Sequence, residues 1–173
     1  KIFYTTPLKA LSNQKFSDFQ KKYGKENVGL LTGDTSINRN ANIVVMTTEV
    51  FRNMLYGTNF GTLGENLKNV KYVVLDEVHY MNDEQRGTVW EESIIYCPSD
   101  VQIIALSATI HNSLELTNWI NSVHSKTELV YTDFRPVPLK HYHFDPTQPT
   151  KLFPLLTPNG KLNSKINEQK REY

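Results

Sequence analysis

The sequence has little of several features that mark common protein classes. Its single cysteine, Cys97, excludes an internal disulfide and a metal site built from several thiolates, and it fits a reducing compartment. No apolar run approaches the length needed to cross a bilayer. Neither sign of charge dominates, because 19 basic residues are balanced by 18 acidic ones. Binding of nucleic acid is therefore not excluded, but it would have to be local rather than driven by overall charge.

Short apolar segments alternate with helical patterns along most of the 173 residues. The apolar segments lack the polar alternation of a sheet with one wet face, which predicts an α/β fold with a mostly parallel sheet covered by helices on both faces. The expected strands are residues 1–5, 27–32, 43–48, 71–77, 101–109 and 128–132. The expected helices are residues 7–23, 49–56, 85–96 and a fourth that follows Asn112.

The fourth helix carries a start signal, and the pattern loosens beyond it. Asn112 and Glu115 have the spacing of a capping box. The side chains that this helix is expected to bury are Leu116, Ile120 and Val123. Beyond Phe134, several prolines and a polar tail predict a linker that leaves the domain.

Polar residues collect where the predicted strands end, which is where ligands bind in parallel α/β sheets. Asp76 and Glu77 follow one apolar strand directly, and two adjacent acids there are costly unless a cation neutralises them. An aspartate in this place can hold Mg²⁺ through water, and an adjacent glutamate can orient the water that attacks a terminal phosphate. The plainer alternative is that the two acids merely begin a loop.

The motifs DEVH at 76–79 and SATI at 107–110 resemble those of the superkiller-type DExH-box RNA helicases of superfamily two. Further blocks that resemble this family, in order along the chain, are YTTPLKALSNQKFSDF (4–19), LLTGD (30–34), MTTEVFRNMLY (46–56), MNDEQRGTVWEE (81–92) and DFRPVPLKHY (133–142). FPLL (153–156) with GKLN (160–163) resembles the cyanobacterial and chloroplast branch. The resemblance implies a cytoplasmic protein, or a plastid one if it is of chloroplast origin.

This resemblance implies a RecA-like first motor domain over residues 1–135 and a linker toward a second motor domain over residues 136–173. It implies ATP and Mg²⁺ as cofactors and RNA as the substrate, with the second RecA-like domain of the same protein as a partner and no membrane. Asp76 would hold Mg²⁺ through water, and Glu77 would position the hydrolytic water. His79 would link the nucleotide site to the SATI motif and to the second motor domain. The residues that would couple hydrolysis to strand separation are Ser107, Ala108 and Thr109. The residues that would hold the nucleic-acid backbone are Pro7, Leu8, Lys9, Gly33, Asp34, Thr47, Thr48 and Glu49.

One family feature is missing from the sequence, namely the phosphate loop G-x-x-x-x-G-K-[ST]. We expect this loop and its strand before Lys1, and the arginine finger of the second motor domain after Tyr173. The chain is therefore expected to be an incomplete first motor domain, inactive alone and active as an ATP-hydrolysing helicase within the full-length protein.

Two other functions stay open on the sequence. One is a non-catalytic RNA-binding or scaffolding module that never had a phosphate loop. The other is a DNA translocase of the same superfamily, because motifs that face the backbone do not separate RNA from DNA.

Several further residues have plainer interpretations. Arg86 could touch nucleic acid or could equally pair with a neighbouring acid, Asp83 or Glu84. His141 and His143 alternate along the chain but lack an obvious third ligand, so a metal site is disfavoured. Three further residues, Trp90, Trp119 and Cys97, are expected to lie in the core.

Overall fold

The computed structural model describes residues 1–56, 67–108, 112–132, 134–144, 146, 150–164 and 166. The chain divides into two compact units, Lys1–Leu129 and Val130–Tyr173. Each unit is described by itself below. No helix in the described ranges combines the length and the apolar character needed to traverse a bilayer.

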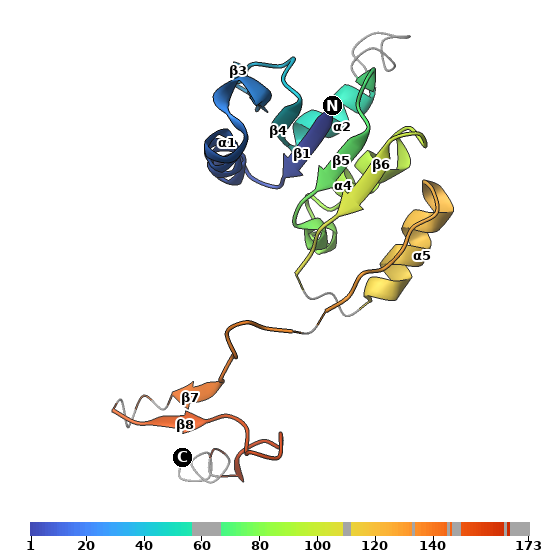
Figure 1. Ribbon diagram of the computed structural model, residues 1–173. Coiled ribbons are helices and arrows are strands. Elements are labelled where there is room, and N and C mark those ends of the chain that lie inside the picture. The colour runs from blue at the N-terminus through green and yellow to red at the C-terminus, as the bar shows by residue number, and fades with distance from the viewer. Residues whose placement is uncertain are drawn as a thin grey trace. The chain divides into compact units, whose positions relative to one another are not determined.

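The first unit contains a six-stranded sheet with the order β3-β2-β4-β1-β5-β6 (Figure 1). Its strands are β1 (Ile2–Thr6), β2 (Val28–Leu31), β3 (Ser36–Ile37), β4 (Ile43–Thr47), β5 (Tyr72–Leu75) and β6 (Gln102–Ala105). All neighbouring strands run parallel except β2 and β3, which are antiparallel. The prediction of a mostly parallel sheet is confirmed.

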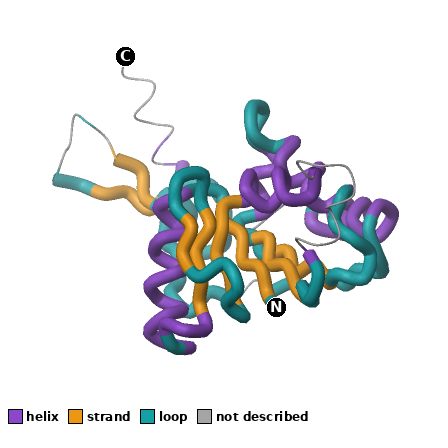
Figure 2. The backbone as a smooth tube through the Cα atoms, turned by 90° about the horizontal axis from the view of Figure 1, so that it is seen from above, coloured by secondary structure: helices purple, strands orange, loops and turns teal. Residues whose placement is uncertain are grey.

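Helices cover both faces of this sheet, as predicted (Figure 2). The helical segments are α1 (Lys9–Tyr23), η1 (Lys25–Asn27), α2 (Thr48–Tyr56), η2 (Val78–Asn82), α4 (Thr88–Ile95) and α5 (Ser113–Val123). On one face, Phe16 and Phe19 of α1 pack against a small core that includes Val45. On the other face, Phe51 of α2 and Ile94 of α4 belong to the largest core cluster. The side-chain alternation of the strands divides these cores, because Phe3 of β1 lies on the α2 side and Tyr4 on the α1 side.

Three sequence predictions about elements are wrong. Residues 128–132 form no strand, and Val130 is 94% exposed, because an apolar segment forms a strand only where a sheet edge is available to pair with it. The capping box at Asn112 is not formed, since its side chain caps no N–H group and its backbone leaves the extended conformation that the box requires. Val123 is exposed, whereas Ile120 is buried.

The element ends differ from the predictions in a way that matters for the site. β5 ends at Leu75 and β6 at Ala105, so the acid pair at 76–77 and the segment 106–108 are irregular. The acid pair and Ser107 therefore follow their strands rather than end them, whereas Thr47 is the last residue of β4.

The second unit contains a short antiparallel pair, β7 (Tyr142–Phe144) and β8 (Leu152–Pro154). His143 lies opposite Phe153 in this pair. Several apolar side chains on it are exposed, including Tyr142 and Leu152. That residues 136–173 link to a second motor domain stays a prediction.

Candidate functional site at the carboxyl ends of the strands

The acid pair lies directly beyond β5, where Asp76 is held from three directions. Its backbone N–H donates to the carbonyl oxygen of Thr5 (3.0 Å). Its Oδ2 accepts a hydrogen bond from the Tyr4 hydroxyl (2.7 Å), and its Oδ1 accepts one from the backbone N–H of Glu77 (3.0 Å). The carboxylate is therefore oriented by the protein before any ligand arrives, while the remaining lone pairs of its oxygens are available for one.

Tyr4 is a part of this site that the sequence did not reveal. A tyrosine in the middle of a strand is usually a core residue, and only the parallel pairing of β1 with β5 brings its hydroxyl to Asp76. Burial, with the hydrogen bond to Asp76, raises the pKa of the Tyr4 phenol above its ordinary value. The hydroxyl consequently stays protonated at neutral pH and remains a donor to the carboxylate.

Glu77 occupies a backbone conformation that is rare for its residue type. Its φ of 56° and ψ of 45° are left-handed, which costs a non-glycine residue about 1–2 kcal/mol. The next residue, Val78, is buried and donates its N–H to the carbonyl oxygen of Leu106 (2.9 Å), which fixes the turn. Strain that the surrounding structure maintains is common at functional sites.

This turn gathers several of the predicted catalytic and coupling residues. His79 Nδ1 lies 3.3 Å from Glu77 Oε2 and 3.4 Å from Ser107 Oγ. The loop after β5 thus contacts the loop after β6 through one imidazole. Ala108 is exposed, and Thr109 lies outside the described residues.

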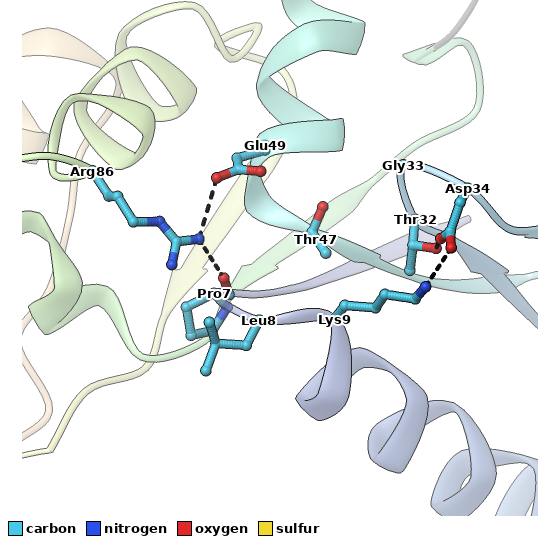
Figure 3. A pocket seen from close by; sticks show the side chains of 9 residues that line it. All are labelled: Pro7, Leu8, Lys9, Thr32, Gly33, Asp34, Thr47, Glu49 and Arg86. Carbon is cyan, nitrogen blue, oxygen red and sulfur yellow. Dashed lines mark hydrogen bonds and ion pairs between the residues drawn. The ribbon is translucent and has the colours of Figure 1, made fainter.

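A pocket of about 320 Å³ lies beyond the ends of β1, β2 and β4 (Figure 3). The residues that line it are Pro7, Leu8, Lys9, Thr32, Gly33, Asp34, Thr47, Glu49 and Arg86. All the predicted backbone-binding residues are in this group except Thr48. That side chain is buried, and its hydroxyl donates to the carbonyl oxygen of Thr6 (3.1 Å), which fixes the start of α2.

Arg86 and Thr32 line the pocket although neither was among the predicted site residues. Arg86 Nη2 donates to the carbonyl oxygen of Pro7 (2.8 Å) and to Glu49 Oε1 (3.2 Å). The alternative of an ion pair with Asp83 or Glu84 is wrong. Asp83 instead accepts the backbone N–H of Arg86 (2.9 Å), so this acid shapes the turn and leaves the guanidinium to the pocket.

Each cation of the pocket is paired with a carboxylate. Lys9 Nζ donates to Asp34 Oδ2, and Thr32 Oγ1 donates to Asp34 Oδ1 (2.9 Å). The hydrogen bond from Lys9 and the one from Thr32 lower the pKa of the Asp34 carboxyl. Arg86 is paired with Glu49 in the same way. The pocket therefore has two cations and two anions, with the N-terminus of α1 beside Lys9 adding positive dipole character.

A mostly parallel sheet with an acid pair after an inner strand, and with a pocket beyond three neighbouring strands, is typical of a RecA-like motor domain. The chain belongs to the DEAD/DEAH box helicase family, whose sequence model matches residues 1–117. The sequence resemblance to DExH-box helicases is thereby confirmed.

Curated relatives are similar over most of this chain. The chloroplastic DExH-box ATP-dependent RNA helicase DExH15 of Arabidopsis thaliana is 54% identical over 96% of the chain, which corresponds to 14% of that protein. The probable helicase HelY of Mycobacterium tuberculosis is 53% identical over 80% of the chain and 15% of its own length. The chain thus spans only about a seventh of the length of these relatives.

Solved structures confirm the RecA-like fold. The helicase Lhr of Mycobacterium smegmatis, solved with ssDNA and AMP-PNP, superposes with a TM-score of 0.53 at 24% identity over 68% of this chain and 18% of that one. The DUF1998 helicase MrfA, solved with DNA, gives a TM-score of 0.51 at 24% identity over 72% of this chain and 19% of that one.

Proposed function

We propose that this chain is part of the first motor domain of an ATP-dependent RNA helicase, in which the acid pair serves the nucleotide and the pocket holds the nucleic-acid backbone. The observation that carries the proposal is the placement of both groups at one edge of the sheet, joined by the segment from Glu77 to Arg86. A helicase must couple its nucleotide site mechanically to the nucleic acid that it moves along. The segment from Glu77 to Arg86 connects the acid pair to the pocket through the backbone. Residues 136–173 would lead toward the second RecA-like domain.

The acid pair fits a hydrated Mg²⁺ that is bound mainly through phosphates. Asp76 would hold the ion through water, and its carboxylate is already oriented by Tyr4 and the Glu77 N–H group. No group of three or more potential ligands that could hold a metal occurs in the ranges that the structure describes, so a cage built only from protein is not supported there. When bound, the ion would neutralise charge on the phosphates of ATP.

The roles of the neighbouring residues follow from their contacts. The Glu77 carboxylate would orient the attacking water and accept hydrogen bonds from it. His79 contacts both Glu77 and Ser107, so a movement of the Glu77 carboxylate would be transmitted through the imidazole to the loop after β6. Ser107, Ala108 and Thr109 would carry that change toward strand separation.

The pocket suits a nucleic-acid backbone rather than bases. Its polar groups are a lysine, an arginine, hydroxyls and carboxylates, and it has no lining aromatic side chain on which a base could stack. Gly33 has no side chain and open space around its Cα, so a ligand can approach the protein backbone closely there, while Lys9 and Thr47 offer donors. Such contacts position a strand without reading its sequence.

RNA is preferred to DNA because of the 54% identical relative, whose name describes an RNA helicase. A DNA translocase is the second candidate, and it is favoured by the two solved neighbours bound to DNA. A non-catalytic scaffold would keep the pocket but would not use the oriented acid pair.

The proposal is tested by measuring ATP hydrolysis by the full-length protein without nucleic acid and with single-stranded RNA or DNA of one sequence. We expect hydrolysis that RNA stimulates more than DNA does. Stimulation by DNA alone would favour the translocase, and no hydrolysis under any condition would favour the scaffold.

Replacement of Tyr4 by phenylalanine tests the orientation of Asp76. It removes one hydrogen bond to a charged group, worth about 1.5–3 kcal/mol, and keeps the ring against Phe19. We expect turnover by the full-length protein to fall about tenfold or more at low Mg²⁺ and to recover in part at high Mg²⁺. The control is Tyr23→Phe, which alters an exposed tyrosine on α1. An unchanged dependence on Mg²⁺ would show that the Tyr4 hydroxyl does not position the carboxylate.

A further inference from the structure

Arg86 lines the pocket but was not among the residues expected to hold the nucleic-acid backbone, and its guanidinium is only partly used. The two hydrogen bonds of its side chain both leave from Nη2, to Pro7 and to Glu49. Within the described ranges, Nε and Nη1 have no protein partner. In Figure 3 the side chain extends to the side of the pocket formed by Glu49 and Pro7, opposite Lys9 and Asp34.

We propose that Arg86 is a ligand of a backbone phosphate through Nε and Nη1, which are unpaired in the part of the chain that the structure describes, and that Glu49 neutralises its charge in the free protein until the phosphate displaces the carboxylate. This inference rests on the proposed function, since it names a further residue of the same nucleic-acid pocket and the way that its charge is held. A guanidinium presents its N–H groups in a planar fork that matches a phosphate, and such an arginine is rarely replaceable by lysine.

The turn that carries Arg86 is well fixed, as a ligand position requires. Asp83 accepts N–H groups from Gln85 and Arg86, and the N–H of Gly87 donates to the Asp83 carbonyl oxygen (2.8 Å). A Cβ at Gly87 would lie 2.2 Å from the carbonyl oxygen of Met81, so no larger residue fits without backbone movement. The position of the Arg86 backbone is therefore set by its own loop and not by Glu49.

The Glu49 carboxylate, by contrast, can separate from Arg86 with little loss of free energy. Its side chain is 51% exposed, and a solvent-exposed ion pair contributes little net stability because water replaces the lost partner. Lys9 and Asp34 repeat the arrangement on the other side of the pocket, with Asp34 64% exposed. Two exposed carboxylates thus neutralise the two cations, and an entering phosphate would compete with each carboxylate for its cation.

This arrangement predicts opposite effects for the two members of the pair. In the full-length protein, Glu49→Gln removes the competitor, so we expect RNA to bind up to about fivefold more tightly. Arg86→Ala removes the ligand, so binding should weaken, and the slope of log K against log salt should flatten by about 0.7, the value for one phosphate of a single strand. The double variant should behave like Arg86→Ala, because Glu49 acts only through the arginine.

The chain offers a matched control in a second arginine–glutamate pair outside the pocket. Arg52 Nη1 lies 3.4 Å from Glu92 Oε2, with 27% and 33% of the two side chains exposed. Glu92→Gln and Arg52→Ala remove the same charges from the same unit, and we expect neither to change the salt slope.

The measurement is fluorescence anisotropy of a labelled single-stranded RNA at several salt concentrations. If Glu49→Gln weakens binding or leaves it unchanged, the displacement mechanism is wrong. If Arg86→Ala leaves the slope of log K against log salt unchanged, Arg86 contacts no phosphate and acts only as a structural link to Pro7. Should Arg86→Ala fail to fold, Glu49→Gln still decides. If the wild-type protein binds no nucleic acid, the proposed function fails instead, which is a separate outcome.

Discussion

In the full-length protein, Glu77→Gln is expected to abolish ATP turnover while ATP binding is retained. The substitution keeps the size of the side chain and a polar contact to His79, but it removes the carboxylate that would orient and polarise water. Loss of such a group costs about 10²-fold or more in turnover. Asp76 and its hydrogen bonds from Tyr4 and the Glu77 N–H group do not depend on the Glu77 side chain, so the affinity for nucleotide should stay within a few-fold of wild type.

Steady-state hydrolysis and a nucleotide-binding titration measure the two effects separately. Glu84→Gln is the control, because it removes a nearby exposed acid without touching the turn. Turnover within a few-fold of wild type would show that Glu77 does not position the water. A parallel loss of binding and turnover would point instead to a collapse of the left-handed turn.

The second large effect is expected from Phe51→Ala. Phe51 is completely buried on α2 and meets the ring of Phe3 edge to face, with ring centroids 6.3 Å apart. Truncation of a buried phenylalanine costs about 3–5 kcal/mol, through lost burial and the cavity left behind. Because Glu49 lies two residues earlier on the same helix, the loss should also loosen that wall of the pocket.

Thermal denaturation of this domain should therefore show a clear decrease in midpoint for Phe51→Ala. Phe144→Ala is the control, since Phe144 is about half exposed in the second unit. A loss no larger than that of the control would mean that α2 is not anchored by the core as described.

The sheet was largely predictable because its inner strands are uninterrupted apolar segments. Residues such as Val44, Val45 and Val73 leave no polar face, and a parallel sheet is the structure that buries both faces. β3 was missed because its two residues, Ser36 and Ile37, are exposed and give no pattern. The false strand at 128–132 shows the converse, since a strand-forming composition does not say whether a partner strand exists.

The site was predictable to the extent that it is made of contiguous motifs. Pro7, Leu8 and Lys9 belong to one block, and the acid pair belongs to another. Arg86 was harder, because its partner Glu49 lies 37 residues away while Asp83 and Glu84 are adjacent. Sequence spacing alone favours an acid adjacent to the arginine as its partner. Only the fold shows that Asp83 already accepts backbone N–H groups from Gln85 and Arg86.

The lone cysteine has a practical consequence for labelling this domain with fluorescent dyes. Cys97 is buried near the end of α4, and burial raises the pKa of its thiol to about 12, so almost no reactive thiolate is present at neutral pH. Maleimide dyes should therefore leave this domain unlabelled unless a new cysteine is introduced. An engineered pair of attachment points, one at the exposed Lys126 and one on α1 at the exposed Lys21, would report distance changes within the domain when Mg-ATP or RNA is added to the full-length protein, with no background label from Cys97.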